Sequence, residues 1–125
     1  MIALIDYGSG NLRSVHKALL KVGAQVRLAR RPEEMAEAEA VVLPGVGAFD
    51  HAIELLNQSG MRDTLDEIVL QERVPVLGIC VGMQIMARSS EEGRLPGLGW
   101  INGHVKKFVF AQIRIGSVSN SSQQN

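Results

Sequence analysis

A chain of 125 residues suits one small domain with a modest core. Its formal net charge is zero and 46% of its residues are hydrophobic, which removes the general electrostatic argument for a nucleic-acid partner or an anionic membrane. One cysteine, Cys80, excludes an internal disulfide framework and a multi-thiolate metal site. No apolar run approaches the roughly 18 residues that span a bilayer and no basic leader follows Met1, so we expect a cytoplasmic protein.

Short apolar runs alternate with helical patterns along the chain, which predicts an α/β fold with an open, mostly parallel sheet. The predicted strands cover residues 2–5, 25–29, 40–43 and 74–79. An apolar stripe at 3- and 4-residue spacing predicts a helix over residues 11–22. Asn11 is suited to cap this helix and Gly23 to end it.

Further helix is predicted around Ile53 and Leu56 and over residues 61–70, with a break near Gly60. Another short helix is expected over residues 81–88, after the fourth strand. Residues 95–109 suggest a glycine-punctuated turn followed by strand. Residues 116–125 contain one hydrophobic residue in ten. Burial cannot offset the ordering entropy of such a segment, and we expect it to be disordered.

The motif Gly78-Ile79-Cys80-Val81-Gly82 directly follows the fourth predicted strand. It has the form of a nucleophile elbow, which exposes its central residue at a sharp strand-to-helix turn. A helix N-terminus favours the thiolate of Cys80, and the N–H of Val81 would be placed to stabilise an oxyanion. The alternative is that Cys80 is a small buried hydrophobic residue, and the motif alone leaves both interpretations open.

Two other glycine-rich segments follow predicted strands. In residues 43–49, glycines on both sides of Val46 allow a backbone excursion that could aim N–H groups at a ligand, although an ordinary strand–helix turn explains them equally. Residues 6–12 begin like a dinucleotide fingerprint, but Arg13 occupies the third glycine position. A nicotinamide cofactor is therefore not expected, and the absence of G-K-[ST] excludes a P-loop.

The three histidines, His16, His51 and His104, show no metal-ligand spacing, so no metal site is predicted. His16 and His51 are expected on solvated helix faces. His104 is the only histidine after Cys80 and hence the default candidate for a general base. Because no acid follows it to orient the ring, we interpret His104 as a bystander.

Five segments together resemble the glutaminase subunit of imidazole glycerol phosphate synthase, a class I glutamine amidotransferase of histidine biosynthesis. They are DYGSGNLRSV (6–15), LPGVGAFDHA (43–52), PVLGICVGMQ (75–84), SSEEG (89–93) and PGLGWINGHVKKF (96–108). The elbow alone points to class I amidotransferases in general, and the first two segments select the subfamily. The resemblance implies a flavodoxin-like sheet, with a partial type 1 amidotransferase domain over residues 1–110 and a divergent tail over 111–125.

The resemblance also implies roles for particular residues. Cys80 would attack the side-chain amide of L-glutamine, giving a thioester and ammonia, and water would then release glutamate. Val81 and Val46 would supply the oxyanion N–H groups, the second only after a backbone reorientation. The residues implied to bind glutamine are Gly45, Gly47, Gln84 and Glu92. Glu92 would meet the α-ammonium group, although by itself it is typical of a solvated surface acid.

In this family, ammonia passes to a (β/α)₈ cyclase partner, and no cofactor, nucleic acid or membrane is involved. The family's base is a histidine two residues before a glutamate, in an H-P-E motif that follows the cysteine. Here no Asp or Glu follows Glu92, and His104 lies in no such motif. We therefore expect a C-terminally truncated glutaminase with negligible activity alone.

The sequence leaves two alternative functions open. One is a non-catalytic remnant that still binds the cyclase partner. The other is a cysteine-centred stress protein of the DJ-1-like group, which shares the elbow but is disfavoured by the Pro-Gly-Val-Gly loop and by Gln84. If the sheet is truncated, it exposes an unpaired edge and unburied apolar helix faces, which predicts aggregation.

Overall fold

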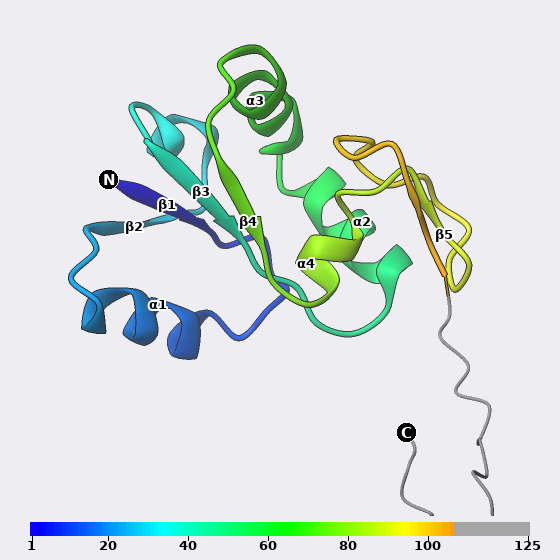
Figure 1. The fold of residues 1–125 in the computed structure, drawn as a ribbon, viewed down its shortest axis with the longest axis horizontal. Helices are drawn as coiled ribbons and strands as arrows, with labels where there is room; N and C mark the ends of the chain where they lie inside the picture. Colours follow the sequence, from blue (N-terminus) through cyan, green and yellow to red (C-terminus); the bar gives the residue numbers. More distant parts are fainter. Residues whose placement is uncertain (107–125) are drawn as a thin grey trace, which may run out of the picture.

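The computed structural model describes residues 1–106, and its main sheet has four parallel strands. The strands are β1 (Ile2–Ile5), β2 (Val26–Ala29), β3 (Ala40–Leu43) and β4 (Val76–Gly78). Their order is β2-β1-β3-β4, so β1 and β3 are central and β4 forms one edge (Figure 1). Ile2 pairs with Val26 on one side and with Ala40 on the other. The predicted α/β fold with an open parallel sheet is confirmed.

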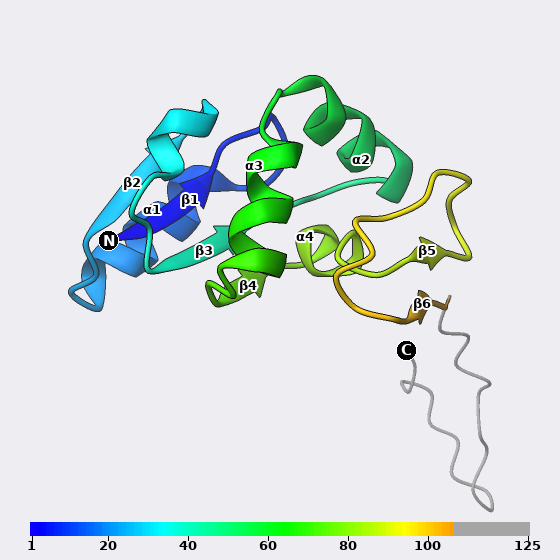
Figure 2. The ribbon, with the colours of Figure 1, turned by 90° about the horizontal axis from the view of Figure 1, so that it is seen from above.

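Helices lie on both sides of this sheet (Figures 1 and 2). On one side is α1 (Leu12–Lys21), and on the other are α2 (Phe49–Gln58) and α3 (Arg62–Asp66). Because side chains alternate along a strand, Leu4 points to the opposite face from Ala3 and Ile5. All three are fully buried, which fits a parallel sheet with both faces covered at its centre.

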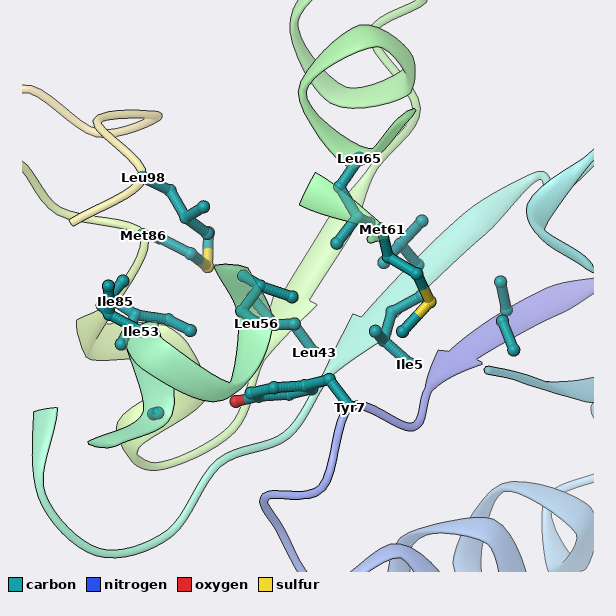
Figure 3. Packing of buried hydrophobic residues seen from close by; sticks show 14 of the residues in the cluster. Ile5, Tyr7, Leu43, Ile53, Leu56, Met61, Leu65, Ile85, Met86 and Leu98 are labelled. Carbon is teal, nitrogen blue, oxygen red and sulfur yellow. The ribbon is translucent and has the colours of Figure 1, made fainter. Parts of the chain in front are cut away.

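The main hydrophobic core fills the space between the sheet and the α2–α3 side, as Figure 3 shows. Strand side chains such as Ile5 and Leu43 meet Leu56 of α2 and Leu65 of α3 there. The other labelled members of this cluster are Tyr7, Ile53, Met61, Ile85, Met86 and Leu98. Aromatic residues are scarce in this chain, and Leu, Ile and Met side chains fill much of the core instead. Met in particular adapts to irregular gaps.

The first helix has the predicted ends. The side chain of Asn11 caps α1 by accepting the N–H of Ser14 at 3.5 Å. Val22 is the C-cap, and Gly23 follows with φ +88°, the left-handed conformation that ends many helices. None of the residues of α1 is fully buried, so this helix covers its side of the sheet only loosely.

The second helical region is interrupted where expected. A break separates α2 from α3 at Gly60, whose φ is +80°. The helix then continues with wider turns as η2 (Glu67–Gln71). The N–H of Val74 donates to the carbonyl of Ile68 instead of joining the sheet, so β4 is shorter than the predicted 74–79. A single turn, η1 (Pro32–Met35), follows β2 and was not predicted.

The expectation of a helix over residues 81–88 is wrong, because α4 (Val81–Gln84) is only one turn long. The N–H of Arg88, which would bind the carbonyl of Gln84 in a continued helix, donates to the carbonyl of Gly103 instead. The carbonyls of Ile85 and Arg88 accept N–H groups of the 97–101 loop. Tertiary hydrogen bonds thus replace the helical ones, which a local pattern cannot reveal.

A second, two-stranded parallel sheet lies beyond α4. It joins β5 (Ser89–Ser90), which was not predicted, to β6 (His104–Val105). The predicted strand near the end of residues 95–109 is therefore present in part. Its last residues, the domain boundary at 110 and the tail over 111–125 lie outside the described residues.

Within residues 1–106, β4 has a strand partner on one side only. Leu77 projects from β4 toward the α1 side and is 57% exposed. Val22 at the end of α1 is 79% exposed. The edge and apolar surface expected from the sequence are thus present in the described region. No helix in that region is long and apolar enough to cross a membrane.

Candidate active site

Three loops meet at the edge where the parallel strands end. They follow β1 (residues 6–11), β3 (residues 44–48) and β4 (residues 79–80). Hydrogen bonds join the second of these loops to Ser9 of the first and to Val81, the residue directly after the third. In open α/β sheets, this carboxyl edge is where ligands bind. All three glycine-rich motifs singled out in the sequence therefore belong to one place in the fold.

Cys80 has the backbone geometry of a nucleophile elbow. It lies between β4 and α4 with φ +55° and ψ −124°, a conformation that costs a non-glycine residue about 1–3 kcal/mol. Its side chain is exposed, which contradicts the alternative of a small buried hydrophobic residue. Strain and exposure at a strand end are typical of functional residues.

The sharp turn requires glycine at position 82. A Cβ atom there would lie 2.0 Å from the carbonyl oxygen of Leu43. On the facing loop, a Cβ atom at Gly45 would lie 2.5 Å from the backbone nitrogen of Gly82. The two backbones are therefore in direct contact, and this contact holds the 44–48 loop beside the elbow.

The N–H groups of Val81 and Val46 both have partners. The N–H of Val81 donates to the carbonyl oxygen of Gly45 at 3.1 Å. The N–H of Val46 donates to the hydroxyl oxygen of Ser9 at 3.0 Å. Neither group is free to bind an oxyanion in this conformation, so their assignment as oxyanion donors stays a prediction.

The loop after β1 forms hydrogen bonds with the 44–48 loop. Besides the Ser9 contact, the hydroxyl of Tyr7 donates to the carbonyl oxygen of Pro44 at 2.5 Å. Burial raises the pKa of Tyr7 to about 12, so the hydroxyl remains a donor. Ser9 and Tyr7 were not predicted as site residues. Their position after β1 was the available signal, because β1 and β3 are neighbours in the sheet.

The other predicted site residues lie on the elbow and on adjoining segments. Gln84 ends α4, where its N–H donates to the carbonyl oxygen of Cys80 at 3.2 Å. Gly47 is exposed with φ +85°, and a Cβ atom would meet nothing within 4 Å. Glu92 is exposed and its N–H donates to the Ser90 hydroxyl at 3.1 Å.

Asp50, in the first turn of α2, connects the segment after Glu92 to the loop after β3. Its carboxylate accepts the N–H of Arg94 at 2.9 Å and that of Leu95 at 3.0 Å. These bonds, first from Arg94 and then from Leu95, hold the pKa of Asp50 below its ordinary value. Asp50 was not predicted as a site residue, because nothing in its local sequence distinguishes it from a solvated helix acid.

The last candidates are His104, as a general base, and groups of side chains that could bind a metal ion. The ring of His104 makes a hydrogen bond with the hydroxyl of Ser89 at 2.5 Å, within the small β5–β6 sheet. In residues 1–106, no hydrogen bond to the Cys80 thiol is found. The same part of the chain contains no cluster of His, Cys, Asp or Glu that could hold a metal ion.

Comparison with known proteins gives consistent matches. Residues 3–122 match the family described as Glutamine amidotransferase class-I. Imidazole glycerol phosphate synthase subunit HisH of Bdellovibrio bacteriovorus is 52% identical over 108 residues, covering 86% of this chain and 53% of that protein. The protein of the same name from Leptospira interrogans is 46% identical over 112 residues, covering 90% and 55%. This chain therefore spans about half the length of the curated relatives it matches.

A solved structure described as a crystal structure of glutamine amidotransferase has the same fold. It superposes with a TM-score of 0.69 at 22% sequence identity. The aligned region covers 85% of this chain and 56% of that one.

Proposed function

The chain belongs to the class-I glutamine amidotransferase family, and from that premise we propose that it carries the nucleophile of a glutaminase. The substrate is L-glutamine, and the products are glutamate and ammonia. The sequence similarity to HisH proteins supports a more specific role in imidazole glycerol phosphate synthase. In that role, the ammonia passes to a (β/α)₈ cyclase partner in the cytoplasm.

The reaction begins when the Cys80 thiolate attacks the side-chain carbonyl carbon of glutamine. The amide nitrogen then gains a proton, the C–N bond breaks and ammonia leaves, and a γ-glutamyl thioester remains on Cys80 until water hydrolyses it. The N–H groups of Val81 and Val46 stabilise the tetrahedral oxyanion. Gly45, Gly47 and Gln84 contact the substrate, and Glu92 binds its α-ammonium group.

The observation that carries this proposal is the backbone of Cys80. A strained, exposed cysteine between a strand end and a helix start is costly to maintain and has no structural use as a core residue. The glycine-rich loop after β3 lies in backbone contact with the elbow, which supports the proposal that this loop takes part in the chemistry. The same observation disfavours a role in partner binding alone.

Proton transfer limits what residues 1–125 do alone. General acid–base catalysis typically raises the reaction rate about 10²–10⁴-fold. The sequence contains no H-P-E motif, and no Asp or Glu follows Glu92. We expect Cys80 to react with a glutamine-like electrophile, whereas steady turnover of glutamine stays near background.

A chloroketone analogue of L-glutamine tests this function directly. The analogue carries a chloromethyl ketone in place of the amide, so the thiolate forms a C–S bond as chloride leaves. Intact-mass spectrometry should show one adduct on the wild-type chain and none on Cys80→Ala. Iodoacetamide serves as the control for ordinary thiol reactivity.

Protection of Cys80 from the chloroketone by L-glutamine distinguishes a glutamine site from a merely reactive thiol. L-Glutamine should slow the chloroketone reaction several-fold, and D-glutamine should not. Labelling no faster than that of a free thiol, with no protection by L-glutamine, would contradict the proposed function.

A further inference from the structure

Glu92, assigned to the α-ammonium group of glutamine, lies in a turn after β5 and not on the loops at the carboxyl edge of the main sheet. Within residues 1–106, its carboxylate forms no hydrogen bond or ion pair. Its backbone N–H donates to the hydroxyl of Ser90 at 3.1 Å, and the N–H of Gly93 donates to the carbonyl of Ser90 at 3.2 Å. The carboxylate is therefore available to a ligand, and the backbone of this turn determines where it starts from.

The far side of the turn rests on Asp50. One carboxylate oxygen of Asp50, Oδ1, accepts the N–H groups of Arg94 and Leu95, both at 3.0 Å, and Oδ2 accepts that of Arg94 at 2.9 Å. Gly93 permits a close approach, since a Cβ atom there would lie 2.5 Å from Oδ1 and 2.9 Å from a ring carbon of Phe49. The turn therefore lies directly on the first turn of α2.

This contact connects two segments that are proposed to bind the same substrate. Helix α2 begins directly after the 44–48 loop, with Ala48 as its N-cap, so Asp50 lies two residues beyond that loop. On its other side, the turn is attached to the small sheet, where the N–H of Glu91 donates to the carbonyl of Val105 at 2.8 Å. The Asp50 bonds instead attach the turn to the helix that continues from the loop.

Binding of an ammonium group makes strict demands on this arrangement. A charge-assisted hydrogen bond between a carboxylate and an ammonium group needs the two within about 3 Å. An exposed carboxylate on a loose segment loses conformational freedom when it binds, which offsets most of the attraction. Glu92 contributes to affinity to the extent that its backbone is already held in place.

We propose that Asp50 is a positioning residue that fixes the turn carrying Glu92 beside the 44–48 loop, and thereby gives the site its preference for ligands with an α-ammonium group. This inference rests on the proposed function of Cys80. It assigns a role in substrate selection to a side chain that touches neither the substrate nor the nucleophile.

Two chloroketones that differ only in the α-amino group test this role. One is the chloroketone analogue of L-glutamine, and the other lacks its α-amino group. Each rate of Cys80 labelling is divided by the rate of the same compound with a free thiol, which removes differences in intrinsic reactivity. The ratio of the two corrected rates, here called the amino preference, then reports recognition of the ammonium group.

Substitution of Asp50 should lower the amino preference. Asp50→Ala removes both acceptors and should reduce it several-fold, with labelling by iodoacetamide unchanged. Asp50→Asn keeps one side-chain oxygen and should give an intermediate value. Asp63→Ala removes an exposed acid from the first turn of α3 and, as the matched control, should leave the preference at the wild-type value.

A double-mutant cycle separates positioning of Glu92 from a general structural effect. Glu92→Gln should itself lower the amino preference, and adding Asp50→Ala to it should lower the preference no further, because Asp50 acts through Glu92. A merely structural role would slow labelling by both chloroketones by a common factor and leave their ratio unchanged. If Asp50→Ala does not fold, Asp50→Asn takes its place in the same cycle.

The inference is overturned if the Asp50 variants keep the wild-type preference, or if Asp50→Ala lowers the preference further in a chain that already carries Glu92→Gln. A wild-type chain without any amino preference would overturn the role of Glu92 and this inference with it. Failure of the proposed function is a separate result, because L-glutamine would then not protect Cys80 in the wild-type chain. If only the role of Asp50 fails, that protection persists.

Discussion

The N–H of Val81, the residue after the nucleophile, donates to the carbonyl oxygen of Gly45 at 3.1 Å. This bond ties the elbow to the loop after β3, and the close approach of Gly82 to that loop makes the bond possible. The geometry of the site is thus determined by backbone contacts between loops as much as by side chains. Substitutions that alter these contacts should therefore affect stability as well as chemistry.

Gly82→Ala should destabilise the fold strongly. The new Cβ atom would lie 2.0 Å from the carbonyl oxygen of Leu43 and 2.7 Å from the carbonyl carbon of Pro44. Backbone atoms cannot move aside cheaply, so we expect a loss of about 3 kcal/mol or more in the free energy of unfolding, measured by urea denaturation. Gly103→Ala is the control, because its Cβ atom would make only an ordinary contact at 3.7 Å. Equal effects of the two substitutions would contradict the close approach.

The stability of the chain should depend on pH through Asp50. Hydrogen bonds from Arg94 and Leu95 lower the pKa of Asp50 in the folded state. Its stabilising contribution is therefore complete above the unfolded pKa of about 3.9 and is lost as pH falls through the lower, folded value.

Urea denaturation at pH 7 and pH 3 measures this contribution. Asp50→Asn should be less stable than wild type at pH 7, and the difference should shrink toward pH 3. Asp63→Asn changes an exposed acid in the first turn of α3 and is the control. A difference between wild type and Asp50→Asn that stays constant with pH would exclude the carboxylate as its source.

Self-association should depend on the open edge at β4. Leu77 is 57% exposed there, and an edge strand offers unpaired backbone groups to a second chain. Leu77→Lys should shift sedimentation profiles toward the monomer, because a charge on the edge disfavours pairing. Leu70→Lys, at a 49% exposed leucine of η2, is the matched control. If both substitutions act alike, general hydrophobicity rather than this edge drives association.

The contact between Trp100 and Asp66 should stabilise the docking of the 97–101 loop on α3. The indole Nε1–H donates to the carboxylate of Asp66 at 2.7 Å. Asp66→Ala leaves that half-buried donor without its partner and should cost about 1–3 kcal/mol. Trp100 is the only tryptophan, so a red shift of fluorescence in the native state reports the change directly. Glu67→Ala, at the exposed next residue, should leave the emission unchanged.

Local patterns predicted the sheet and most of the helices. Apolar runs located all four strands of the main sheet, and Gly23 and Gly60 ended helices where expected. These features succeed because they depend on residues close in sequence. The predicted helix over residues 81–88 was too long for the opposite reason, since the N–H of Arg88 donates to the distant carbonyl of Gly103.

The same distinction applies to the candidate site. The G-x-C-x-G motif offered the elbow at Cys80 as one of two interpretations, and it could do so because a nucleophile elbow is a local structure. Ser9 and Asp50 act on residues far along the chain, and their side chains are ordinary in local context. Only the order of the strands in the sheet brings them to the site.

The contact between Ser9 and Val46 joins residues 37 positions apart in the chain, and the one between Gly45 and Val81 is of similar range. Such contacts close long loops, whose entropic cost must be met before the contacts form. The three loops therefore acquire their geometry only when β1, β3 and β4 have all paired. Any state in which β4 is unpaired would carry Cys80 as an ordinary thiol, so the positive-φ backbone of this residue depends on complete assembly of the sheet.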